Sequence, residues 1–150
     1  MSSCLFIACE YELPTLYSPK LHKPDGREIN VFQSEDDLYD LEIIPGMVFY
    51  DIPYYTKLSN IYDLNFRYTE ERCQRLYDYL INNCKRYKKC EIWSIWLANC
   101  ATKRSFKNDI KNELKNLEVI SLPLNELTVD TLKYILDSDE TPKKLTLYWF

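Results

Sequence analysis

The chain has 150 residues, a net charge of −4 and a hydrophobic content of 46%, which are typical of a single folded domain with one substantial core. Glycine occurs only twice, at Gly26 and Gly46, so phosphate-binding loops of the G-x-x-x-x-G-K and G-x-G-x-x-G kinds are nearly excluded. No window approaches the run of about 18 apolar residues that a transmembrane helix needs. These totals predict one soluble domain over residues 1–150.

The six cysteines are expected to be buried, reduced thiols. The apolar run from Cys4 to Cys9 lacks the basic flank of a signal peptide and is interrupted by Glu10, so we expect no export and a cytoplasmic location. No C-x-x-C pair occurs and the chain contains one histidine, so the pattern predicts neither a metal site nor a cofactor. The richness in Lys, Asn, Ile and Tyr is typical of AT-rich bacterial and phage genomes.

The first third of the chain is acidic. Residues 1–42 contain nine Asp or Glu against three Lys or Arg, whereas residues 43–150 contain 14 acids and 16 bases. A bias of this kind can steer a basic partner toward one part of a protein.

Within this third, residues 4–9 have apolar side chains on both faces and predict a buried strand. Residues 10–26 contain three prolines and predict an extended loop, which is followed by a short strand over residues 28–33. Ser34 and the acids after it are typical of a helix start, because acids suit the positive end of the helix dipole.

Two strands and a helix are predicted next. Residues 47–52 predict a strand, and residues 61–68 alternate apolar and polar side chains in the half-buried pattern of an outer strand. Residues 69–89 carry the clearest amphipathic helix, with Thr69 as its N-cap. Four bases are expected at the negative end of this helix: Lys85, Arg86, Lys88 and Lys89. Tyr87 is expected on its buried stripe.

The central strand is predicted at residues 90–98. Ile92 and Trp96 point to one face of this segment, and Trp93 and Ile95 point to the other. An edge strand would show one polar face, so both faces of this strand need apolar cover.

The rest of the chain predicts alternating elements. Residues 102–116 are polar and weakly periodic, so a helix and an ordered loop both remain open there. Residues 118–122 predict a strand, Thr128 predicts the N-cap of a further helix, and residues 143–150 predict a final strand.

This order predicts an α+β fold with a mixed sheet. Its core would be ferredoxin-like (split βαβ) from about residue 47 onward, with an N-terminal strand and loop as an extension. If residues 102–116 formed a full crossover helix, the alternative would be a three-layer α/β fold with a mostly parallel sheet. A two-layer core leaves one apolar face open, which the N-terminal third, the segment at residues 102–116 or a homodimer contact would have to cover.

The composition favours an interaction protein over an enzyme. Tyrosine occurs 13 times, and it is enriched at interfaces because it offers a large rigid contact area with a polar tip. We therefore predict a protein–protein interaction module of the inhibitor or immunity type, which binds a basic protein through an acidic, tyrosine-rich surface. The predicted contact residues are Glu35, Asp36, Asp37, Asp40, Tyr50, Tyr54 and Tyr55.

Two other functions remain open. An enzyme would need a nucleophile, a base and an orienting group together, and no orienting partner for the single histidine is evident, so no catalytic residue is assigned. The options considered are Cys4, Cys9 and Cys100 with His22, or the carboxylates Asp51 and Asp63. Nucleic-acid binding would use the basic segment Lys103–Lys115, but no recognition motif accompanies it. The strand at residues 90–98 would also hold this segment away from the bases at residues 85–89.

Overall fold

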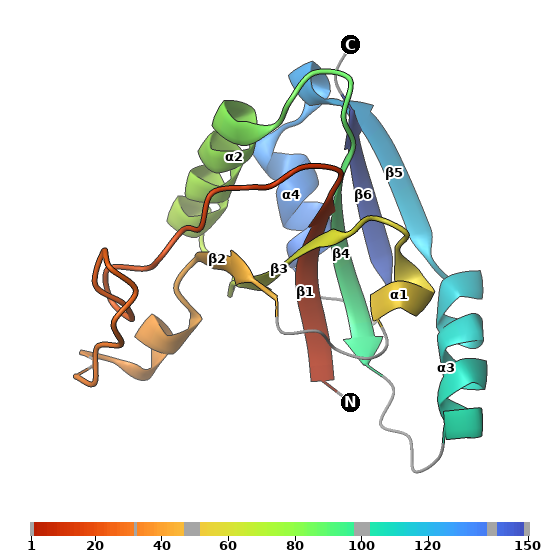
Figure 1. The fold of residues 1–150 in the computed structure, drawn as a ribbon, viewed down its shortest axis with the longest axis horizontal. Helices are drawn as coiled ribbons and strands as arrows, with labels where there is room; N and C mark the ends of the chain where they lie inside the picture. The colour runs from red at the N-terminus through yellow and green to blue at the C-terminus, as the bar shows by residue number, and fades with distance from the viewer. Residues whose placement is uncertain (1, 32, 47–51, 98–102, 138–140, 149–150) are drawn as a thin grey trace.

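Figure 1 shows the fold in a computed structural model, which describes residues 2–31, 33–46, 52–97, 103–137 and 141–148. The strands in this part of the chain are β1 (Ser2–Cys9), β2 (Glu42–Pro45), β3 (Asn60–Asn65), β4 (Cys90–Leu97), β5 (Glu118–Pro123) and β6 (Lys143–Tyr148). The helices are α1 (Ile52–Tyr55), α2 (Glu70–Asn83), α3 (Lys103–Lys115) and α4 (Val129–Leu136), with two 3₁₀ helices, η1 (Glu35–Tyr39) and η2 (Leu124–Glu126).

The strands form one mixed sheet in the order β2-β3-β1-β4-β6-β5. Among the described strand pairs, β5 and β6 run parallel and the other four pairs are antiparallel. The predicted α+β class with a mixed sheet is confirmed. The alternative of a mostly parallel sheet is wrong, because α3 joins β4 to a strand that runs in the opposite direction and β1 enters the sheet between β3 and β4.

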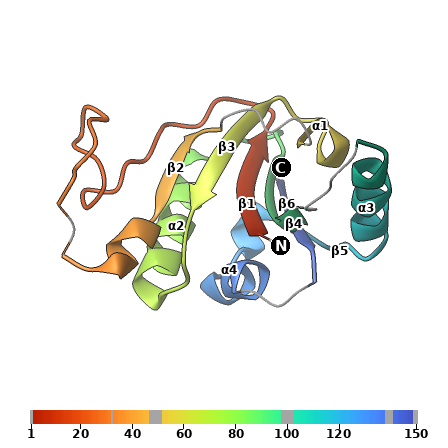
Figure 2. The same cartoon turned by 90° about the horizontal axis from the view of Figure 1, so that it is seen from below.

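β4 lies next to β1 in the middle of the sheet, as its double apolar pattern predicts. The side chains of Ile92, Trp93 and Ile95 are all almost fully buried, so both faces of the strand are covered. Figure 2 shows the reason: α2 and α4 lie on one side of the sheet, and α1 and α3 lie on the other.

The α2/α4 face carries the larger core. Ile7, Ile92 and Leu145 of the sheet pack in one cluster with Leu80 of α2 and Leu132 of α4. Both predicted N-caps are confirmed, since the hydroxyl of Thr69 accepts from the N–H of Arg72 and that of Thr128 accepts from the N–H of Thr131.

α2 ends at Asn83, six residues before the predicted end. Cys84 has extended backbone angles and its N–H bonds to the carbonyl of Leu80, which closes the last turn. Tyr87 adopts a positive φ of 62°, which no helix allows, and its side chain is 80% exposed rather than buried. The four bases expected at the end of the helix therefore lie in the loop between α2 and β4.

The α1/α3 face carries a smaller core. Phe6 and Trp93 stack at the centre of this face, and Ile52, Tyr55 and Ile110 from the two helices pack over them. The segment at residues 102–116 is thus mainly a helix, and together with α1 it covers the face that a two-layer core would have left open. The homodimer through this face stays a prediction, although the chain itself supplies apolar cover.

The connections resemble the predicted core in one respect. β3 and β4 are both antiparallel to β1, so the β3–α2–β4 unit is a split βαβ with one strand between its two strands. That intervening strand is β1, which comes from the N-terminal extension. The ferredoxin-like order therefore stays a prediction.

Three local expectations differ from the structure. Residues 28–31 form no strand beyond a single bridge between Glu28 and His22, because the loop folds back on itself. The strand predicted at residues 47–52 lies outside the described residues, except that Ile52 begins α1. β3 is not an outer strand, because β2 pairs along its free edge.

Candidate functional site

Two of the predicted contact residues, Asp36 and Asp40, are held by arginines of α2. The guanidinium of Arg72 donates to Asp36 Oδ2 at 2.8 Å and to Asp40 Oδ1 at 3.2 Å. Arg75 reaches Asp40 at 3.2 Å, and Arg67 lies 3.8 Å from Asp36. These five residues form the Asp–Arg network, which joins η1 to the first turns of α2.

The Asp–Arg network is buried at one end and open at the other. Asp40 and Arg72 have side-chain exposures of 2% and 5%, whereas Asp36 is 52% exposed. Burial alone would raise the pKa of Asp40, but hydrogen bonds from Ser18, Arg72 and Arg75 hold it below the usual value. The hydrogen bond from Arg72 likewise lowers the pKa of Asp36. Both carboxylates thus stay charged for internal reasons.

The remaining acids of the predicted surface have different roles. Asp37 accepts from the N–H groups of Gln33 and Ser34 and pairs with Lys20 at 3.3 Å, so it organises the start of η1. Burial would raise the pKa of Asp37, and these partners lower it. Glu35 is exposed.

The predicted tyrosines lie elsewhere. Tyr54 and Tyr55 belong to α1, on the other side of the sheet from the Asp–Arg network (Figure 2). Tyr54 is 49% exposed, whereas Tyr55 is buried and its hydroxyl donates to Glu113 of α3 at 2.6 Å. Tyr50 lies outside the described residues. The seven predicted contact residues therefore do not form one surface.

A polar contact also orients His22. Its Nδ1 lies 2.6 Å from Oε2 of Glu42 in β2, a partner that sequence spacing did not reveal. The nearby hydroxyl of Ser18 donates to Asp40 at 2.5 Å rather than to the imidazole, and Ser18 is fully buried. The hydroxyl of Ser18 is therefore engaged by Asp40, and these contacts anchor the long N-terminal loop on β2.

Of the enzyme options, the structure tests the pair of Cys9 with His22, which gains no geometric support. The free thiol of Cys9 donates a hydrogen bond to the sulfur of Cys90 rather than to His22. Asp63 lies in β3 opposite Phe6, on the α1/α3 face. Cys100 and Asp51 lie outside the described residues. Within the described ranges, no group of three or more His, Cys, Asp or Glu side chains could hold a metal ion.

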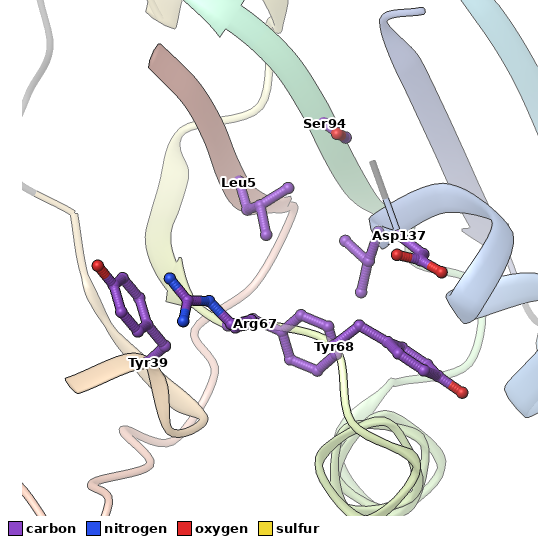
Figure 3. A pocket seen from close by; sticks show the side chains of 8 residues that line it. Leu5, Tyr39, Arg67, Tyr68, Ser94 and Asp137 are labelled. Carbon is purple, nitrogen blue, oxygen red and sulfur yellow. The ribbon is translucent and has the colours of Figure 1, made fainter. Parts of the chain in front are cut away.

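A pocket of about 340 Å³ opens beside the Asp–Arg network (Figure 3). Its floor comes from the sheet, and its walls come from η1, the β3–α2 junction and the end of α4. The lining residues are Leu5, Tyr39, Phe66, Arg67, Tyr68, Ser94, Leu136 and Asp137. We call this site the anchor pocket.

Aromatic and charged groups meet in the anchor pocket. The guanidinium of Arg67 lies 3.6 Å from the ring centroid of Tyr39, and the ammonium of Lys133 lies 5.1 Å from that of Tyr68. Figure 3 shows Tyr39 and Arg67 at one side of the pocket and Asp137 at the other. Tyr and Arg are the residue types that dominate the energy of protein interfaces.

The prediction from sequence missed this pocket. The Phe-Arg-Tyr run at residues 66–68, between a strand and a helix, was the only local signal available. Asp137 lies far along the chain and is brought to the pocket by the packing of α4 on α2.

The basic segment predicted for nucleic acid is α3, in which Lys111 and Lys115 are exposed. The basic loop at residues 85–89 leads into the start of β4, whereas α3 follows its end, and Figure 1 shows the two far apart. The described part of the chain thus offers no joint basic patch of these two segments.

No similar protein indicates a function for the site, so its geometry alone must indicate one. Among the described residues, none of the helices has both the length and the apolar character needed to cross a membrane. No protein-family model matches this chain, and comparisons with curated proteins and with solved structures found no match either.

Proposed function

We propose that this protein is a protein–protein interaction module that binds a basic partner at the anchor pocket. The observation that carries the proposal is the position of Asp137 across a pocket lined by Tyr39, Phe66 and Tyr68. A hollow with aromatic walls and one carboxylate suits a single anchoring side chain, and such anchors supply most of the energy of many interfaces.

The proposed anchor is an arginine or lysine of the partner. Its aliphatic stem would lie along Leu5 and Leu136, and its charged head would meet Asp137, since the ring of Tyr68 already faces the ammonium of Lys133. Arg67, in the opposite wall, is already stacked on Tyr39 and close to Asp36, so its charge is partly compensated.

The charge around the pocket supports a basic partner. η1 contributes the exposed acid Glu35, and the first turn of α2 contributes the exposed acids Glu70 and Glu71. Exposed acids at a rim raise the association rate of a basic partner and make binding weaken with added salt. This replaces the surface predicted from sequence, because the tyrosines of α1 lie on the other side of the sheet.

The test compares pocket variants in affinity capture from a host lysate at low salt. We expect a stoichiometric basic partner whose capture falls at least about tenfold with Tyr68→Ala and with Asp137→Asn, and falls again at high salt. Circular dichroism would show that both variants remain folded.

The matched control is Tyr54→Ala, which removes an exposed tyrosine from α1. Capture that survives both pocket variants contradicts the proposal. Loss of capture with Tyr54→Ala alone would move the contact to the α1 side of the sheet.

A further inference from the structure

The two edges of the sheet differ in how the rest of the chain covers them. At the β2 edge, Leu16 and Ile43 exchange both backbone hydrogen bonds, at 2.8 and 2.9 Å, so the N-terminal loop pairs with the strand. The N–H of Ser18 also donates to the carboxylate of Glu42 there. β5 forms the opposite edge (Figure 1), and in the described part of the chain only β6 pairs with it. An open edge offers its unpaired N–H and C=O groups to a further strand.

The hydrogen bonds of β5 show which of its backbone groups face outward. The N–H of Glu118 donates to the carbonyl of Pro142, just before β6, at 2.9 Å, so the backbone groups of Glu118 face β6. Successive residues of a strand direct their N–H and C=O groups to opposite sides, so the even-numbered residues of β5 all face β6. Val119 and Ser121 therefore direct both backbone groups away from the sheet.

The side chains of β5 also suit a further strand. Ile120 and Leu122 pack against the α2/α4 core, so Val119 and Ser121 point to the other face of the sheet, where both are exposed. Val119 is 53% exposed, which makes it one of the most exposed large apolar side chains among the described residues. Residues 119–122 contain no charge and no proline, the features that usually block pairing at a sheet edge.

We propose that β5 is a dimerisation edge, to which the β5 strand of a second copy of this chain adds in the antiparallel direction. Val119 of one copy exchanges both backbone hydrogen bonds with Ser121 of the other, and Ile120 packs on Ile120 of the other copy at the two-fold axis. The sheets of the two copies then form one continuous sheet. β5 lines no part of the anchor pocket, so the dimer is independent of the proposed function.

The charges at the two ends of β5 favour a second copy over an unrelated strand. α3 leads into the start of β5 and carries the exposed bases Lys111 and Lys115, whereas η2 follows its end and carries the exposed acid Glu126. The carboxylate of Glu118, at the start of β5, is engaged by the hydroxyl of Tyr134. Antiparallel pairing places the start of one β5 beside the end of the other, so bases face an acid at both ends of the interface.

The test measures the oligomeric state of the full chain by sedimentation equilibrium, together with amide hydrogen exchange by NMR. One pair of short strands makes a small interface, so we expect a monomer–dimer equilibrium between micromolar and millimolar protein. The amides of Val119 and Ser121 should gain protection from exchange as the dimer forms. Those of Ile120 and Leu122 should be protected at every concentration, because they face β6.

Two variants block the edge without changing the bonds to β6. Ser121→Pro removes an outward N–H, at an edge position where proline is tolerated, and Val119→Lys places a charge on the pairing strand. Each should raise the Kd of the dimer at least about tenfold, and circular dichroism would show that the variants remain folded. Val31→Lys is the matched control, because it makes the same substitution at an 82%-exposed valine of the N-terminal loop and should leave the Kd unchanged.

Two results would overturn the proposal. One is a protein that stays monomeric up to millimolar concentration, which would leave the β5 edge to a strand of another protein. The other is a dimer that persists in both Ser121→Pro and Val119→Lys, because such a dimer must form through a different surface.

Discussion

Both faces of the sheet are apolar, but they are covered in different ways. On the α2/α4 face, two capped helices bury a broad cluster, and the Asp–Arg network and the N-terminal loop close its margin. On the α1/α3 face, a single-turn helix and a polar helix cover a smaller cluster centred on Trp93. From this difference we expect the first face to carry most of the stability, and the cover of the second face to open without unfolding of the sheet.

The largest expected effect is in the Asp–Arg network, at the edge of the α2/α4 face. Arg72→Ala removes one of the two arginines that hold the 2%-exposed carboxylate of Asp40. Removing one member of a buried ion pair costs roughly 3–5 kcal/mol, and we expect a loss at the lower end of this range because Arg75 and Ser18 remain. Urea unfolding would measure the loss in the free energy of unfolding. Arg27→Ala is the control, because its pair with Asp25 is exposed and contributes at most about 1 kcal/mol. Similar losses in both variants would contradict the comparison.

A matched leucine pair tests the two faces directly. Leu80→Ala empties a fully buried position in the α2/α4 face and should cost roughly 3 kcal/mol. Leu114→Ala removes a partly buried contact of α3 and should cost roughly 1 kcal/mol. Hydrogen exchange should show opening of α3 alone in the second variant. Equal losses would mean that the two faces contribute equally.

Acid should destabilise η1 and β2, which these aspartates hold, at a higher pH than it destabilises the centre of the sheet. The pKa values of Asp36, Asp37 and Asp40 are lowered in the folded state, so their contribution to stability is present above the unfolded value of about 3.9 and is lost as the pH falls through the folded values. Hydrogen exchange should show loss of protection in η1 and β2 below about pH 4 while β4 stays protected. Asp40→Asn should flatten this dependence, and an unchanged profile in that variant would exclude Asp40 as a cause.

The smallest expected effects come from deleting one hydroxyl on each face. Tyr79→Phe removes the hydrogen bond to the carbonyl of Pro14 that ties the N-terminal loop to α2, and should cost about 1 kcal/mol. Tyr55→Phe removes the bond to Glu113, whose carboxylate can regain water, and should cost about 0.5 kcal/mol. Thermal unfolding of both variants would rank them, and a larger loss for Tyr55→Phe would reverse the comparison.

The helix on the α2/α4 face was easier to predict from the sequence than the helix on the α1/α3 face. The α2 stripe, its Thr69 cap and the doubly apolar β4 are signals carried by neighbouring residues, and both elements form, although α2 ends at Asn83. The segment that became α3 left a helix and a loop both open, because its periodicity is weak and its cover of the sheet depends on Ile110 meeting Trp93.

The candidate site was harder to predict than the fold. The acids at residues 35–40 suggested a surface for a basic partner, but Arg72 and Arg75, more than thirty positions later, hold Asp36 and Asp40 from α2. A charge count along the chain cannot distinguish a solvated carboxylate from one that is buried against an arginine.

The sequence alone determined the elements whose signals are local: the caps, the apolar periodicities and the central position of β4. Only the tertiary structure decided the order of the strands, the insertion of β1 between β3 and β4, and the anchor pocket. Each of these brings together residues from separate elements, such as Cys9 and Cys90 or Tyr68 and Asp137. Local propensity is set within a few residues, whereas contacts between residues far apart in the sequence depend on how whole elements pack.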